Sequence, residues 1–192
     1  MTVWQEVINH DDSTNDDNLK YAEALIKTGD WAGARQVLND IPPTHETYDR
    51  YRLEAIVADS NKEWKRADSF YEIAAGLTTT PASVLNNWGF SKLTRGDAAG
   101  AEKLFAEAAQ HDSKRFVIKN NLALARAAQG NYTLPIVPMT QTERAELLHT
   151  MGLSAAKRGD IAMAKTLFRD AVSTHPQYFE AANRSLNALE NS

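Results

Sequence analysis

A two-residue signal recurs through this chain at an interval close to 34 residues. In four copies a glycine precedes a polar residue, and in one copy a lysine takes the place of the glycine. The copies are Gly29-Asp30, Lys62-Glu63, Gly96-Asp97, Gly130-Asn131 and Gly159-Asp160. Glycine ends a helix well because it readily adopts a positive φ, and aspartate or asparagine caps the helix that follows. The signal therefore predicts pairs of short helices, repeated along the chain.

Small and large apolar residues follow this signal at fixed distances. The small residues are Ala34, Ala67, Ala101 and Ala164, and the large ones are Leu38, Tyr71, Phe105 and Phe168. Small residues let two helices approach closely, and a large residue fills the space between repeats that cannot bury their apolar faces alone. A two-helix repeat near 34 residues is the signature of the tetratricopeptide repeat, or TPR. We therefore predict an all-α fold, a TPR helical-hairpin superhelix (α-solenoid).

The glycine-polar pairs also place the repeat boundaries. The repeats are expected to begin near residues 15, 48, 82, 116 and 145. Together they predict a single TPR domain over residues 15–192. Residues 1–14 are rich in aspartate, asparagine and serine and are expected to form a flexible N-terminal segment. After Pro176, apolar residues at helical spacing predict a capping helix over residues 177–190, as the end of a solenoid requires.

Two local signals add detail to this pattern. Repeat two lacks the turn glycine, so Asn61 or Lys62 must make the turn instead. Thr140 and Glu143 have the spacing of a capping box, which is typical of a helix start.

The fourth repeat departs from the pattern where its second helix should begin. The chain reads Thr133-Leu134-Pro135-Ile136-Val137-Pro138-Met139 there, and a proline inside a helix costs about 3 kcal/mol. We therefore expect an interrupted fourth repeat, with an extended apolar strap over residues 133–140. The strap would either cover the face that the missing helix leaves bare or keep Ile136, Val137 and Met139 partly exposed as a partner contact or hinge.

The composition argues against several functional classes. The chain has no cysteine, which excludes disulfides, thiolate nucleophiles and zinc-thiolate sites. No pair of its five histidines has the i, i+4 spacing of a helical metal site, and nothing in the sequence resembles a nucleophile paired with a base. We therefore expect no catalytic residues, no metal and no cofactor. The net charge of −4, with no basic cluster longer than a pair such as Lys114-Arg115, argues against nucleic acid.

The resemblance to TPR proteins implies that the first helices of the repeats line a concave groove. The apolar candidates at its groove-facing positions are Leu53, Ile56, Phe90, Leu93, Leu124 and Leu153, and His149 lies at another such position. The middle and C-terminal parts of this groove are therefore expected to be apolar. Apolar grooves on helical scaffolds suit an amphipathic partner helix.

Asparagine pairs occupy the same groove-facing positions in repeats three and four, as Asn86-Asn87 and Asn120-Asn121. An amide side chain carries a donor and an acceptor, so it can pair with a peptide bond in both directions. Such a ladder is similar to that of TPR domains that grip extended chains. The alternative is that these asparagines are solvated or bond to neighbouring helices within the stack.

Several motifs between roughly residues 82 and 190 together resemble one family. They are Asn86-Asn87-Trp88-Gly89-Phe90 with Gly96-Asp97, Asn120-Asn121-Leu122-Ala123-Leu124-Ala125, the strap Leu134-Pro135-Ile136-Val137-Pro138-Met139, and His175-Pro176-Gln177-Tyr178-Phe179 with Leu186 and Leu189. They resemble the TadD-type TPR proteins of the bacterial Tad (tight adherence, Flp) pilus assembly systems. The strap and the terminal helix are more specific than the repeats themselves.

The resemblance implies a protein of the periplasmic face of the outer membrane, usually a lipoprotein. Such proteins act like pilotins and help the pilus secretin to reach and assemble in that membrane. The acylated cysteine of such lipoproteins is absent from this chain, and residues 1–6 lack the basic and apolar regions of a signal peptide. The chain is therefore expected to be either cytoplasmic or written without its targeting segment.

Three functions follow from these observations. The leading one is a non-enzymatic scaffold of Tad pilus assembly that grips a helix or peptide of the secretin, or of another assembly protein. The second is a general cytosolic TPR adaptor or chaperone-like holder of client peptides. The third is a structural spacer within a larger complex, with no groove ligand.

Overall fold

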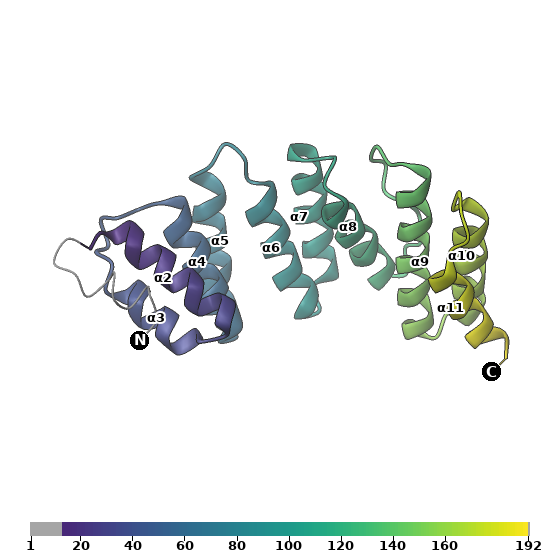
Figure 1. Ribbon diagram of the computed structural model, residues 1–192, viewed down its shortest axis with the longest axis horizontal. Coiled ribbons are helices and arrows are strands. Elements are labelled where there is room, and N and C mark those ends of the chain that lie inside the picture. The colour runs from purple at the N-terminus through teal and green to yellow at the C-terminus, as the bar shows by residue number, and fades with distance from the viewer. Residues whose placement is uncertain (1–12, 192) are drawn as a thin grey trace. The chain divides into compact units, whose positions relative to one another are not determined.

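The computed structural model describes residues 13–191 of the chain. Within this range the elements are all helices, which Figure 1 labels in chain order, and no strand is present. The helices are α2 (Asn15–Thr28), α3 (Trp31–Asn39), α4 (Tyr48–Ser60), α5 (Trp64–Gly76), α6 (Ala82–Thr94), α7 (Ala98–His111), α8 (Phe116–Ala128), α9 (Gln141–Arg158), α10 (Ile161–Thr174) and α11 (Glu180–Glu190). The all-α prediction is confirmed.

The chain divides into two compact units, with the boundary inside α6 between Val84 and Leu85. The first unit contains α2 to α5, and the second contains most of α6 together with α7 to α11. That all repeats belong to one domain stays a prediction. Most of the predicted N-terminal segment, residues 1–12, lies outside the described residues. Thr14 forms a capping box with Asp17 at the start of α2.

The turns between paired helices use positive φ, as the glycine signal predicts. Gly29, Gly96, Gly130 and Gly159 all have φ between 80° and 91°. Lys62 takes the same role in repeat two with φ of 60°, which confirms the prediction for that turn. A positive φ strains the backbone of a residue that carries a Cβ. Lys62 therefore makes its turn at a higher energy than glycine would.

The residue after each turn does not always cap the next helix. Asp30 and Asp97 do cap their helices. The Oδ1 atom of each accepts the backbone N–H of the glycine three residues later, Gly33 or Gly100, at 2.9 Å. The expectation is wrong for Asp160, which makes no side-chain cap. Its carboxylate accepts a hydrogen bond from the Tyr132 hydroxyl instead.

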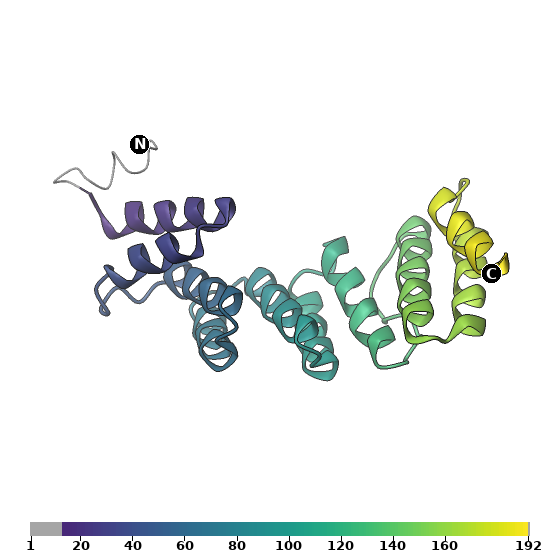
Figure 2. The ribbon, with the colours of Figure 1, turned by 90° about the horizontal axis from the view of Figure 1, so that it is seen from below.

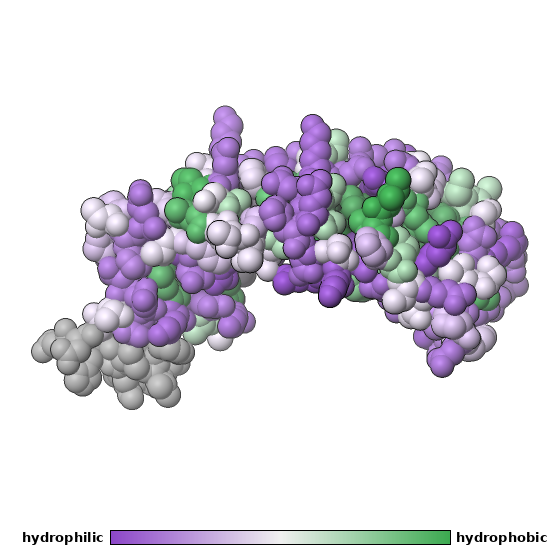
Figure 3. All heavy atoms as spheres, turned by 90° about the horizontal axis from the view of Figure 1, so that it is seen from above, coloured by the Kyte–Doolittle hydropathy of each residue, from purple (hydrophilic) through white to green (hydrophobic). Residues whose placement is uncertain are grey.

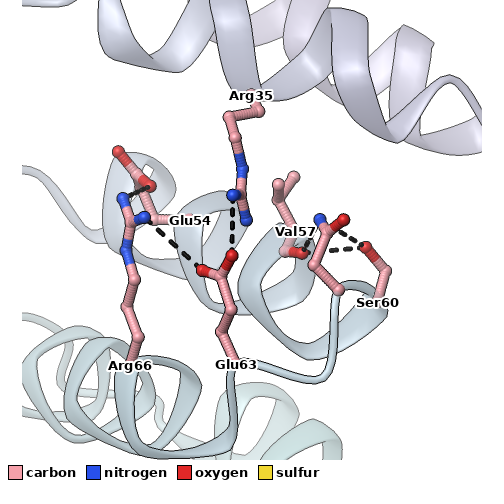
Figure 4. A network of polar contacts seen from close by, with 7 residues as sticks. Arg35, Glu54, Val57, Ser60, Glu63 and Arg66 are labelled. Carbon is pink, nitrogen blue, oxygen red and sulfur yellow. Dashed lines mark hydrogen bonds and ion pairs between the residues drawn. The ribbon is translucent and has the colours of Figure 1, made fainter.

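The first unit is held together by an apolar core and by a polar network across three helices. The buried core residues are Leu19, Ala22, Ala34, Leu38, Ile41, Leu53 and Val57. In the network, shown in Figure 4, Arg35 of α3 donates to Glu63 at 2.7 Å. Arg66 of α5 lies 3.4 Å from the carboxylate of Glu54, a buried residue of α4. Glu63 therefore ties neighbouring helices together rather than capping α5.

The second unit ends in α9, α10 and α11, which pack one beside the next in the turned view of Figure 2. The core here is buried between α8, α9, α10 and α11 and includes Leu147, Met151, Leu167, Phe168 and Ala182. Phe179, Leu186 and Leu189 pack against this core from the α11 end. The predicted C-terminal capping helix is therefore present, although it begins at Glu180, three residues later than expected.

The strap replaces the second helix of repeat four, as its two prolines predict. The chain leaves α8 after Ala128 and enters α9 at Gln141, where Thr140 and Glu143 form the expected capping box. The first helix of repeat five therefore begins at Gln141, which is four residues earlier than the expected residue 145. Leu134 and Met139 pack against the core of the second unit.

The strap is buried in part and exposed in part, and its use as a partner contact or hinge stays a prediction. Pro135 is buried, and Arg126 donates a hydrogen bond to the backbone oxygen of Leu134 at 3.4 Å. Ile136, in contrast, is 100% exposed. The strap thus covers part of the bare face while one apolar side chain remains in solvent.

Candidate protein-binding groove

Three leucines from three first helices of successive repeats meet in the second unit. Leu93 of α6, Leu124 of α8 and Leu153 of α9 line a groove of about 610 Å³, together with Ala128. Leu153 is 50% exposed. Phe90, one helical turn before Leu93 on α6, is 51% exposed. The sequence predicted these four residues as groove residues, and the structure brings three of them to one hollow.

Polar and charged side chains border this apolar floor. Thr150, Ser154, Lys157 and Arg158 of α9 complete the lining. Arg158 is engaged within the protein, because its Nη1 donates to the backbone oxygen of Ala128 at 2.7 Å and its Nε lies 3.4 Å from Asp160. Lys157 is exposed and makes no ion pair with any residue from 13 to 191.

Sequence reasoning did not name these bordering residues. Ala128 and Lys157 occupy the thirteenth position of their repeats, which the TPR resemblance places in the groove. The repeat position was therefore a sufficient signal for both. Thr150 occupies the sixth position, which Asn87 and Asn121 hold in repeats three and four, so the repeat position was a sufficient signal for it as well.

The asparagine pairs mostly bond to neighbouring helices rather than facing a partner. Asn121 of α8 donates from Nδ2 to Oδ1 of Asn86 on α6 at 3.0 Å and is only 8% exposed. Asn120 accepts a hydrogen bond from the Thr150 hydroxyl of α9 at 2.7 Å. These three asparagines thus bond between helices of the stack, as in the alternative interpretation, and a ladder that uses the remaining N–H groups of Asn86 and Asn120 stays a prediction.

Asn87 differs from the other three asparagines. It is half-buried, and its side chain makes no hydrogen bond with another residue of the described range 13–191. Asn87 precedes Phe90 by three residues, so the two side chains share one face of α6. This amide is therefore available to a ligand that contacts Phe90.

His149 lies inside the C-terminal layer and not in the groove. Its ring packs between Phe168 and Phe179, at centroid distances of 5.5 and 5.3 Å, and its Nε2 lies 3.1 Å from the hydroxyl of Ser185 on α11. Burial lowers the pKa of this histidine below its usual value of 6.5. The prediction that His149 contacts a partner is corrected, since its contacts hold the capping helix in place.

Two further predicted groove residues lie in the first unit. Leu53 is 1% exposed in the core of that unit, so its side chain cannot reach a partner, and this prediction is wrong. The burial of Leu53 follows from its place on the helix. Leu53 and Val57 are one turn apart, so both lie on the buried face of α4. Ile56 is half-buried on the same helix.

Hydrophobic surface is not confined to the groove. On the face drawn in Figure 3, green areas of hydrophobic atoms are separated by hydrophilic atoms. Exposed apolar residues outside the groove include Val117 at 47% and Met163 at 41%. The groove is distinguished by the convergence of leucines from three helices, and Met163, which lines a separate hollow beside the strap, offers a matched residue away from it.

In residues 13–191 no group of three or more histidines, aspartates and glutamates is arranged to hold a metal ion. None of the described helices combines the length and the apolar character that a membrane crossing requires.

No protein-family model matches this sequence, and no curated protein matches it significantly. Solved structures do match. PilF of Pseudomonas aeruginosa has a TM-score of 0.60 at 16% identity, over 91% of this chain and 88% of that one. PilW, a widely conserved type IV pilus biogenesis factor, has a TM-score of 0.61 at 14% identity, over 92% and 90%.

A third match is YrrB, a TPR protein with an unusual peptide-binding site. Its TM-score is 0.60 at 11% identity, over 97% of this chain and 98% of that one. Identities this low show the fold and no more. The chain is an all-α protein with the fold of a TPR α-solenoid.

Proposed function

We propose that this chain is a non-enzymatic, protein-binding scaffold of Tad (Flp) pilus assembly. Its groove grips a helix or peptide of the outer-membrane secretin, or of another assembly protein, in the manner of a pilotin. The observation that carries this proposal is the convergence of Leu93, Leu124 and Leu153 on one open hollow. Apolar side chains that line a hollow on a helical scaffold suit the apolar face of a partner segment.

Two likenesses support the choice of partner. The fold is shared with PilW, a type IV pilus biogenesis factor, and with YrrB, which has a peptide-binding site. The motifs of residues 82–190 resemble TadD-type proteins. On this basis the chain acts at the periplasmic face of the outer membrane. Fractionation of the source cells, with an antibody against this chain, tests that location, and a purely cytoplasmic signal would contradict it.

The binding experiment uses the full chain and the purified secretin of the Tad system in the same genome. We expect Phe90→Ala and Leu124→Ala to weaken binding at least tenfold, because Phe90 is exposed one turn from the groove and Leu124 is part of its apolar floor. Met163→Ala is the control, since it removes an apolar side chain of similar exposure from α10. Circular dichroism checks that each variant keeps its helices.

The outcomes separate the candidate functions. Equal binding by wild type, Phe90→Ala and Leu124→Ala would remove the groove as the site. Absence of secretin binding, with capture of unrelated unfolded peptides in a groove-dependent manner, would favour the general adaptor. The free amide of Asn87 beside Phe90 is the feature that suits such client peptides.

A further inference from the structure

The charges that line the groove have one sign. Its lining contains two cations, Lys157 and Arg158, and no carboxylate. Arg158 already has Asp160 and the oxygen of Ala128 as partners. Lys157 has no such partner among residues 13–191 and is exposed. One uncompensated positive charge therefore stands at the edge of an apolar hollow.

We propose that the groove takes an α-helix of its protein partner, and that this helix places a carboxylate against Lys157. This inference rests on the proposed function of the groove and names the chemistry of its ligand. It has two parts, the helical form of the ligand and the position of its acidic residue. Each part follows from a different set of contacts.

The helical form follows from the engaged asparagines. An extended peptide must find partners for its backbone N–H and C=O groups when it enters a groove. Asn86 and Asn120 provide them only in part, because the Oδ1 atom of each already accepts a hydrogen bond from a neighbouring helix, and Asn121 is buried. Among the four asparagines only Asn87 keeps both its donor and its acceptor, which is insufficient to pair the backbone of a segment that crosses three repeats. A helix satisfies its backbone internally and needs only side-chain contacts, which the leucine floor provides.

The position of the acidic residue follows from the spacing on α9. Lys157 lies four residues after Leu153, so it stands one turn, or about 6 Å, further along the same face. Suppose that a ligand helix packs an apolar residue against Leu153. The ligand residue one helical turn from that apolar residue then lies within reach of Lys157. A carboxylate there pairs with Lys157 at the border of the apolar contact.

Lys157 also has a simpler explanation, which the experiment must separate from ligand binding. It lies in the last turn of α9, where a cation interacts favourably with the helix dipole. That role requires no partner. Only a dependence of ligand affinity on the charge of both groups shows that Lys157 recognises a carboxylate.

The test uses three synthetic peptides of roughly 18 residues, about five helical turns. All carry the same leucine stripe in an alanine-rich helix, and they differ only one turn after the central leucine, in Glu, Gln or Lys. Fluorescence anisotropy with the full chain gives each Kd at low and at high salt. We expect the Glu peptide to bind about three- to fivefold more tightly than the Gln peptide, as for a partly exposed ion pair, and the Lys peptide to bind most weakly.

Variants of the chain make the assignment specific. Lys157→Gln should abolish the difference between the Glu and Gln peptides, and Lys157→Glu should make the Lys peptide the best ligand. Lys165→Gln, on α10 and outside the groove lining, is the matched control and should leave the order unchanged. High salt should reduce the preference for Glu while the leucine-dependent binding persists.

A fourth peptide, with proline at its centre and the same leucines, tests the helical form. Proline inside a helix breaks it, so this peptide should lose binding. Equal affinity with and without proline would overturn the helical part. Equal affinity of the Glu, Gln and Lys peptides would overturn the acidic part and leave the proposed function standing. Failure of every peptide would overturn this inference, whereas secretin binding to the groove variants judges the proposed function separately.

Discussion

The ring of Phe168 packs directly against the backbone of Gly152, so that a Cβ at residue 152 would stand 2.5 Å from its Cε1 atom. Phe105 and Gly89 repeat this relationship in the third repeat, at 2.7 Å. In both repeats the absent side chain lets the two helices of a hairpin approach around an aromatic ring. This contact explains why glycine stands inside these helices, where its flexibility otherwise destabilises them.

Gly152→Ala is therefore expected to destabilise the protein. The added methyl group must displace a fully packed ring, which costs about 1–3 kcal/mol of unfolding free energy. Urea denaturation followed by circular dichroism measures it. Gly76→Ala is the control, because no atom lies within 4 Å of the added Cβ, and it should be neutral or stabilising by up to about 1 kcal/mol. Unchanged stability of Gly152→Ala would contradict the close packing.

The buried ion pair of Lys119 and Glu143 gives a second prediction. Lys119 is 3% exposed, and its Nζ lies 2.8 Å from Oε1 of Glu143. Removing one partner leaves the other charge without its main contact, so Lys119→Ala should lower the free energy of unfolding by about 3 kcal/mol. Lys119→Leu should cost less, since Leu85 and Leu148 occupy this position in the third and fifth repeats.

The same pair predicts a dependence on pH. The hydrogen bond from Lys119, and a second from the backbone of Thr140, hold the pKa of Glu143 below its usual value. Its contribution is therefore present above the ordinary glutamate pKa and lost as the pH falls through the folded value. The stability difference between wild type and Lys119→Leu should shrink in acid, and an unchanged difference would argue against the pair.

His149 should destabilise the fold as the pH falls below about 6.5. Burial disfavours its charged form, so the unfolded chain takes up the proton first and gains stability relative to the native state. His149→Gln removes this effect. We therefore expect the unfolding free energy of wild type to fall more steeply between neutral pH and pH 5 than that of the variant. Parallel curves would show that the histidine is not held neutral.

The asparagines should separate folding from binding. Asn121→Ala removes the hydrogen bond to Asn86 and should cost about 1 kcal/mol of stability, with little change in affinity for the partner. Asn87→Ala should leave stability unchanged and weaken binding modestly, because its amide has no bond within residues 13–191. Thermal melts measure the stability of both variants, and titrations with the partner measure their affinity. A loss of stability in Asn87→Ala together with a loss of affinity in Asn121→Ala would contradict the assignment.

The strap gives the last prediction, since its residues differ in burial. Ile136→Ser should change stability by less than about 0.5 kcal/mol, as for other exposed positions. Met139→Ala should be clearly more destabilising, because Met139 packs against the core of the second unit. If Ile136→Ser weakens partner binding at unchanged stability, the strap is a contact site as well as a cover.

The sequence predicted the helical hairpins because the residues that make them act locally. Gly29 and Gly159 end their helices with a positive φ, and the prolines of the strap exclude a helix, whatever lies nearby in space. The groove leucines were also predictable, since a repeat puts equivalent positions on one face. The turns and the strap depend on residues a few positions apart, and the groove positions depend on the repeat interval near 34 residues.

Which polar groups remain free was decided by tertiary structure alone. Asn86 and Asn87 are neighbours of one type, yet one is bonded to a helix 35 residues further on and the other is not. Lys157 and Arg158 differ in the same way, because only Arg158 reaches Ala128 and Asp160. Burial and pairing depend on residues distant in the sequence, so the repeat pattern sets where a side chain stands, and its neighbours decide whether it can bind anything else.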